Sequence, residues 1–220
     1  MRRTTRSLIL QGGLILAGAL VVSSIGGWAH RATADEQPVP AAPAALTELR
    51  SLTHELEAAR GELAVARLQL ERADGVITYS GRYSIPADMA ASIYDIALAE
   101  GVEPGLAFRL VRVESRFDTR AKSTAGAVGL TQILPSTARL YEPGLTPRQL
   151  YDRDTNLRLG FRYLHDLLER YDDNLERALL AYNRGPSKVQ ELLAAGRDPR
   201  NGYERSVMKG YQRLGTRPTE

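Results

Sequence analysis

Residues 104–114 read Pro-Gly-Leu-Ala-Phe-Arg-Leu-Val-Arg-Val-Glu. Their spacing predicts an α-helix, because Ala107, Val111 and Glu114 recur at i, i+4 and i+7 and so share one face. The adjacent stripe is also apolar and arginines occupy the opposite side, the two sets being Leu106, Leu110 and Val113, and Arg109, Arg112 and Arg116. The stretch therefore predicts a helix with an apolar face packed on a core.

Glu114 continues the apolar stripe at the end of this helix, and no cation shares its face. Partial desolvation there would favour the neutral form of the carboxyl and raise its pKa. A raised pKa is what a general acid needs near neutral pH. The alternative is a boundary glutamate whose side chain reaches solvent.

A glycine-containing loop follows the helix. Gly126 and Gly129 allow close approach of the backbone to a ligand, and the amide of Gln132 can both donate and accept hydrogen bonds. This composition suits a pocket for hydroxyl and N-acetyl groups, although such a loop is also typical of an ordinary turn.

A third motif lies near residue 182. Tyr182 ends a helical stripe of core spacing, and its hydroxyl needs a partner if it is buried. Asn183 precedes Gly185-Pro186, so it could equally cap the end of a helix.

Together the motifs Glu114-Ser115, Gly129-Leu130-Thr131-Gln132 and Ala181-Tyr182-Asn183 resemble the soluble lytic transglycosylase (SLT) family. The resemblance runs from about residue 85 to about residue 214, and Thr131 stands where many members carry Met. It implies an all-α, goose-type-lysozyme-like fold that cleaves the peptidoglycan glycan strand, with Glu114 as the single catalytic acid/base. It implies substrate contacts from Ser115, Gly129, Gln132, Tyr182, Asn183 and Tyr203.

The resemblance also implies a lyase reaction. Glu114 would protonate the oxygen between N-acetylmuramic acid and N-acetylglucosamine, and the product would carry a 1,6-anhydro ring. Glycosidases with two carboxylates are the usual alternative, but the context of Asp118 predicts a turn. A hydrolytic muramidase of the same fold and a non-catalytic peptidoglycan-binding envelope protein remain as alternatives.

No cofactor or metal is expected. The chain has no cysteine, which excludes a thiol nucleophile and a disulfide framework. The histidines are scattered and are expected at the surface: His30, His54 and His165. Residues 152–156 resemble the start of a calcium loop, but Leu157 replaces the loop glycine and Tyr163 replaces the bidentate Glu. These acids are therefore predicted to cap a helix.

The N-terminal segment, residues 1–34, predicts a membrane anchor. Arg2, Arg3 and Arg6 precede an uncharged run at 7–29, which is long enough to span a bilayer and would leave the rest outside the cytoplasm. A cleavable signal peptide is the alternative. The expected location is the bacterial cell envelope, periplasmic or extracytoplasmic, after a Pro/Ala linker at 35–43.

Residues 44–74 follow a heptad pattern typical of a coiled coil. One seam position holds Leu49, Leu56, Leu63 and Leu70, and the other holds Leu52, Ala59, Ala66 and Ala73. Glu55–Arg60 and Glu62–Arg67 stand at g and following e positions. Two interpretations stay open: a homodimer through 44–74, or a single helix packed on its own domain.

Residues 75–84 are rich in Gly, Tyr and Ser and predict a connector or short strands, followed by a catalytic domain at 85–220. Its expected helices are 86–100, 104–114, 135–141, 154–171, 174–183, 186–195 and 203–214. Net charge is +3, and residues 81–220 hold the whole excess, which favours an anionic polymer such as peptidoglycan. The excess is too small to indicate nucleic acid.

Overall fold

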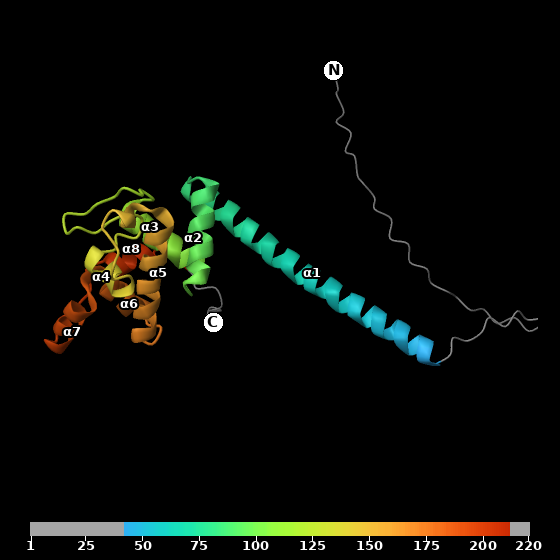
Figure 1. Ribbon diagram of the computed structural model, residues 1–220. Helices are drawn as coiled ribbons and strands as arrows, with labels where there is room; N and C mark the ends of the chain where they lie inside the picture. The colour runs from blue at the N-terminus through green and yellow to red at the C-terminus, as the bar shows by residue number, and fades with distance from the viewer. Residues whose placement is uncertain (1–41, 212–220) are drawn as a thin grey trace, which may run out of the picture. The chain divides into compact units, whose positions relative to one another are not determined.

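The computed structural model describes residues 42–211 (Figure 1). Within this range it contains eight α-helices and one 3-10 turn: α1 (Ala42–Tyr83), α2 (Ala87–Ala99), α3 (Pro104–Ser115), α4 (Pro135–Tyr141), η1 (Gln149–Tyr151), α5 (Arg153–Arg170), α6 (Leu175–Arg184), α7 (Pro186–Ala194) and α8 (Tyr203–Met208). The long loop after α3 holds two isolated bridges, Lys122 with Val128 and Val128 with Ile133. The predicted all-α class is confirmed for the described residues.

The chain divides into two compact units, Met1–Thr53 and His54–Glu220. The predicted anchor at 1–34 and most of the linker lie outside the described residues. Among the helices between residues 42 and 211, none is long and apolar enough to cross a bilayer. The core and the cleft lie in the second unit.

Helix α3 is the centre of the main core. Its buried residues include Leu106, Ala107, Phe108, Leu110 and Val111, as the apolar spacing predicts. They pack with residues of α2, α5, α6 and α8. If each large apolar side chain contributes about 2 kcal/mol on burial, this helix is among the most stabilising elements of the domain.

The start and end of α3 are fixed by local chemistry. Glu103 caps the start, because its carboxylate accepts hydrogen bonds from the N–H groups of Gly105 and Leu106, both at 2.9 Å. Arg116 adopts a left-handed conformation with φ of 53° and ends the helix directly after Glu114 and Ser115. The catalytic candidate is therefore held in the last turn of a well-anchored helix.

Six predicted helices, between residues 86 and 195, begin and end within one residue of α2 to α7. The prediction for 75–84 was wrong, because α1 continues without a break to Tyr83. Tertiary packing overrides the low helix propensity of this stretch: Tyr79 stacks on Phe108 with ring centroids 4.2 Å apart. Gly75 permits the close approach of Tyr94, whose ring would lie 2.4 Å from a Cβ at that position.

The last helix is shorter than predicted. Instead of spanning 203–214, α8 ends at Met208. The guanidinium of Arg109 on α3 donates hydrogen bonds to the carbonyl oxygens of Lys209 and Gly210, and Gly210 has φ of 68°. These contacts turn the chain away from the helical path.

In the second unit the heptad segment is exposed along residues 54–70 and contacts α2 near its end. Residues 54–74 are all exposed, and Leu56, Leu63 and Leu70 are 50%, 51% and 71% exposed. Arg72 forms an ion pair with Asp95 of α2 at 2.5 Å. The interpretation of a helix packed along its own domain therefore does not hold for residues 54–70.

Candidate active site

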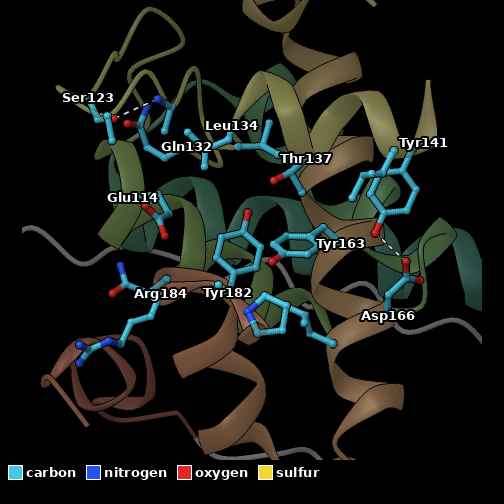
Figure 2. Close-up of a pocket in the computed structure, with 18 of the residues that line it drawn as sticks. Glu114, Ser123, Gln132, Leu134, Thr137, Tyr141, Tyr163, Asp166, Tyr182 and Arg184 are labelled. Atoms are coloured by element: carbon cyan, nitrogen blue, oxygen red, sulfur yellow. Dashed lines mark hydrogen bonds between the residues drawn. The ribbon is translucent and has the colours of Figure 1, made fainter. Parts of the chain in front are cut away.

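A cleft of about 640 Å³ runs between the end of α3, the glycine loop, α4, α5 and the junction of α6 with α7 (Figure 2). It has the size of a pocket for a small molecule or for part of a polymer. The polar residues that line it are Glu114, Ser123, Gln132, Thr137, Tyr141, Tyr163, Asp166, Arg170, Tyr182, Asn183 and Arg184.

Glu114 lies half-buried in this cleft. Burial raises the pKa of its carboxyl from 4.5 to about 7, and a hydrogen bond from the hydroxyl of Tyr203 to Oε1 opposes part of this rise. A carboxyl with a pKa near 7 is present in both forms at neutral pH. It can therefore donate a proton and take one back within a single reaction cycle.

Tyr203 is not among the residues that line the cleft, and its predicted contact with substrate stays a prediction. It reaches Glu114 from α8. Burial, followed by the charge of Glu114, raises the pKa of the Tyr203 phenol well above its ordinary value. The phenol therefore stays protonated and acts as a hydrogen-bond donor that positions the carboxyl.

The glycine loop is held by Asn156, a buried residue of α5. The side-chain oxygen of Asn156 accepts hydrogen bonds from the N–H and the hydroxyl of Thr131, both at 2.9 Å. Its nitrogen donates to the carbonyl oxygens of Val128 at 2.8 Å and Leu150 at 2.9 Å. The side chain of Asn156 thus fixes the glycine loop and ties it to η1, a role that could not be read from the sequence.

Gly129 is placed against Asn156 and does not line the cleft. Its φ is 75°, and a Cβ there would lie 2.3 Å from the side-chain nitrogen of Asn156. Gly160 on α5 likewise leaves room for the loop, because a Cβ at this position would lie 2.3 Å from the hydroxyl of Thr131. Both glycines thus permit close packing of the loop on α5.

Gln132 and Tyr182 both line the cleft beside Glu114. The amide nitrogen of Gln132 donates to the carbonyl oxygens of Gly129 at 2.9 Å and Ala121 at 3.2 Å, which leaves the amide oxygen as the group for a ligand. The hydroxyl of Tyr182 donates to the carbonyl oxygen of Thr131 at 2.9 Å. The third motif is thereby tied to the second.

Asn183 is exposed in the cleft and is not a helix cap, because α6 continues to Arg184 and Gly185 is the C-cap. Its side-chain oxygen accepts a hydrogen bond of 2.8 Å from Asn201. Ser115 is buried outside the cleft, where its hydroxyl donates to the carbonyl oxygen of Val111 at 3.1 Å. The structure therefore brings Glu114, Gln132, Tyr182 and Asn183 into one cleft, and leaves Ser115 and Gly129 in supporting positions.

The far wall of the cleft was not identified from the sequence. It includes Tyr163, Asp166 and Arg170 of α5, and Tyr141 of α4 donates a 2.6 Å hydrogen bond to the carboxylate of Asp166. The α5 residues recur at i, i+3 and i+7, a helical spacing that could have suggested a shared face.

The expected turn and cap are observed. Asp118 is exposed, and its carboxylate accepts a 2.8 Å hydrogen bond from the N–H of Arg120 outside the cleft. Asp152 caps α5 by accepting a 2.9 Å hydrogen bond from the N–H of Thr155. Between residues 42 and 211 there is no group of three His, Asp or Glu residues that could hold a metal ion.

The helical fold and the site define a class: an α-helical domain with a half-buried carboxyl, Glu114, whose pKa is raised to about 7, in a cleft of about 640 Å³. Residues 92–201, half of the chain, match the family model described as Transglycosylase SLT domain. The chain belongs to this family, and the resemblance inferred from the motifs is confirmed.

Individual relatives cover the same region. The soluble lytic murein transglycosylase of Escherichia coli (strain K12) is 37% identical over 99 residues, 41% of this chain and 15% of that protein. The transglycosylase of Enterobacteria phage PRD1 is 36% identical over 88 residues, 40% of this chain and 31% of that protein. The solved 70-kDa soluble lytic transglycosylase in complex with bulgecin A has a TM-score of 0.50 at 28% identity, over 59% of this chain and 24% of that chain. The match thus spans less than a third of each relative.

Proposed function

We propose that this protein is a peptidoglycan lytic transglycosylase that cleaves the bond between N-acetylmuramic acid and N-acetylglucosamine and forms a 1,6-anhydro end. The observation that carries the proposal is the single half-buried carboxyl of Glu114 with a pKa of about 7 in a cleft. Membership of the SLT-domain family supports it.

The chemistry needs one group to act twice. Protonated Glu114 donates its proton to the glycosidic oxygen as the bond from that oxygen to C1 breaks. The N-acetyl oxygen of the muramic residue stabilises the positive charge at C1, the substrate assistance known for some glycosidases. The Glu114 carboxylate then takes the proton of the C6 hydroxyl as its oxygen bonds to C1, so Glu114 ends protonated.

The surrounding residues support this use of Glu114. Tyr203 donates to one carboxylate oxygen and orients the group. Gln132, whose amide nitrogen is held by the loop, offers its amide oxygen to a sugar hydroxyl. Asn183 lines the cleft next to Arg184 and can contact an N-acetyl or hydroxyl group.

A hydrolytic muramidase is the alternative that one observation favours, because Asp166 also lines the cleft. Glu114 and Asp166 lie at opposite sides of the view, with Tyr182 and Tyr163 drawn between them (Figure 2). Asp166 is engaged by the hydroxyl of Tyr141. This arrangement favours the interpretation of Asp166 as a residue of the cleft wall, and not as the group that activates water for attack at C1.

The products distinguish the two reactions. Peptidoglycan digested in water enriched in heavy oxygen should yield anhydro ends without the label, and Asp166→Asn should give the same products. Labelled reducing ends that disappear in Asp166→Asn would establish the muramidase instead. A folded protein that releases no fragments would point to glycan binding without catalysis.

The proposal extends to the rest of the chain. Residues 1–34 would anchor the protein in the cytoplasmic membrane, with the catalytic domain on the outer side, and 35–43 would act as a linker. The exposed leucines of α1 would join two copies in parallel. The packing of Tyr79 and Tyr83 on Phe108 supports a domain that begins within α1, earlier than residue 85.

A further inference from the structure

Glu204, the residue after Tyr203, carries a buried carboxylate that accepts no hydrogen bond from residues 42–211. The residue is 2% exposed, and both carboxylate oxygens lack a donor. The nearest cation is Arg205, whose Nε lies 3.5 Å from Oε1 and whose side chain is 83% exposed. Buried polar groups are almost always hydrogen-bonded, so this carboxylate requires an explanation.

Glu204 lines a cavity of about 790 Å³ that shares no residue with the cleft of Glu114. The wall comes from the start of α6, the loop before α8 and α8 itself, and comprises Glu176, Asp198, Arg200, Glu204, Arg205, Met208 and Lys209. Three acids and three bases therefore face one cavity.

The other two acids of the cavity, Asp198 and Glu176, are already paired with a cation. The Nε of Arg200 lies 2.9 Å from the carboxylate of Asp198 and 3.9 Å from that of Glu176. At the other side, Arg205 and Lys209 lie one and five residues after Glu204 on the same segment. The cavity thus presents a buried carboxylate without a donor, beside exposed cations.

The loop that lines this cavity also contacts the cleft. The carbonyl oxygen of Pro199 accepts a 3.0 Å hydrogen bond from Arg184 of the cleft wall. The side chain of Asn201 donates to Asn183 and accepts from the N–H of Tyr203. A group bound on Glu204 would therefore lie across one loop from the residues around Glu114.

We propose that this cavity binds an amino-acid end that carries an ammonium beside a carboxylate. The ammonium donates to the carboxylate of Glu204, and the carboxylate of the ligand lies towards Arg205 and Lys209. A metal ion fits less well, because three cationic side chains share the wall and the described residues contain no group that could hold a metal. The origin of this ligand rests on the proposed function, because the peptides attached to the glycan strand have ends of this kind.

Direct binding tests the proposal with the full chain. The probes are 2,6-diaminopimelate and pimelate, which share both carboxylates but differ in the ammonium groups, titrated by calorimetry. Wild type should bind diaminopimelate at least about tenfold more tightly than pimelate, the scale of a charge-assisted hydrogen bond. Glu204→Gln should lose at least about tenfold, whereas Glu176→Gln on the rim should change affinity less than about twofold.

Two results overturn the proposal: no preference of wild type for diaminopimelate, or equal binding by Glu204→Gln. Lys209→Ala, which leaves Glu204 intact, provides a second variant and should also weaken binding. Because no cleavage is measured, binding that depends on Glu204 in a protein without glycan cleavage would refute the proposed function and keep this site. Glycan cleavage without binding that depends on Glu204 would refute this site and leave the proposed function intact.

Discussion

At the scale of the residue, Glu114 decides whether the cleft is catalytic. Glu114→Gln should keep the fold and lower glycan cleavage by at least about 10²-fold, the usual scale for a general acid. Release of fragments from peptidoglycan, followed by chromatography, measures the loss. Asp118→Asn is the matched control, because this exposed carboxylate lies outside the cleft, and its activity should remain near wild type.

The ionisation of Glu114 should also make the stability of the protein depend on pH. Its pKa in the folded state, about 7, lies above the unfolded value of 4.5, so ionisation disfavours the folded state. Its contribution is fully present below pH 4.5 and is lost as the pH rises towards 7, by up to about 3 kcal/mol. Glu114→Gln should therefore be the more stable protein at pH 8 and lose that advantage at pH 4, as denaturant titrations at both values can show. If wild type and Glu114→Gln differed in stability by the same amount at pH 4 and pH 8, Glu114 would not be desolvated.

Tyr203 should tune the pH profile of the reaction. Its hydrogen bond opposes the rise of the Glu114 pKa, so Tyr203→Phe should move that pKa further above 7. The alkaline limb of the rate profile, where the acid form is lost, should then shift to higher pH. Ser206→Ala on the exposed side of α8 is the control. A shift to lower pH would show that Tyr203 does not donate to Glu114.

At the scale of the element, the glycine loop offers a matched pair. Gly126 and Gly129 both have positive φ, 87° and 75°, but a Cβ at 126 meets open space while one at 129 collides with Asn156. Gly126→Ala should cost only the backbone term, about 1–2 kcal/mol. Gly129→Ala should cost at least about 1 kcal/mol more, because the loop must move from Asn156. Equal losses in denaturant titrations would refute the packing role of Gly129.

The helices show what the sequence can predict. Periodicity located α2, α3, α5, α6 and α7 because each buries residues at a helical spacing that is visible in the chain, whereas α4 buries only Ala138 and is marked by Pro135 at its start. It failed at 75–84, where Tyr79 forms its stack with Phe108, about thirty residues away. It also failed after Met208, where Arg109 holds the backbone from another helix. Both errors arise from tertiary contacts that local spacing does not contain.

The site also contains residues that the sequence predicts and residues that only the structure reveals. Glu114 could be found because its own helix predicts its burial. Asp166 and Arg170 could not, since the wall of a cleft depends on which faces of α4 and α5 meet the end of α3. Gly129 belongs to a matched motif, yet it is placed for packing, so a motif marks a local structure and not the role of each member.

At the scale of the whole molecule, self-association depends on the exposed seam of α1. If two chains pair in parallel through this seam, Leu63, which is 51% exposed, lies in the interface. Leu68, at 66% exposed, lies on the same helix outside the seam. A soluble fragment, residues 35–220, should be dimeric by analytical ultracentrifugation and keep all of α1, including the part that packs on Phe108.

Leu63→Lys should convert this fragment to a monomer, because it places a charge in each partner's seam, whereas Leu68→Lys should leave the dimer intact. Both variants add the same charge to the same helix, so their difference isolates the seam from net charge and helix propensity. Cleavage by the monomeric variant should be unchanged on soluble glycan, since Leu63 does not line the cleft that holds Glu114. A wild-type fragment that is monomeric at high micromolar concentration, or a Leu68→Lys variant that dissociates as readily as Leu63→Lys, would show that this seam does not join two copies.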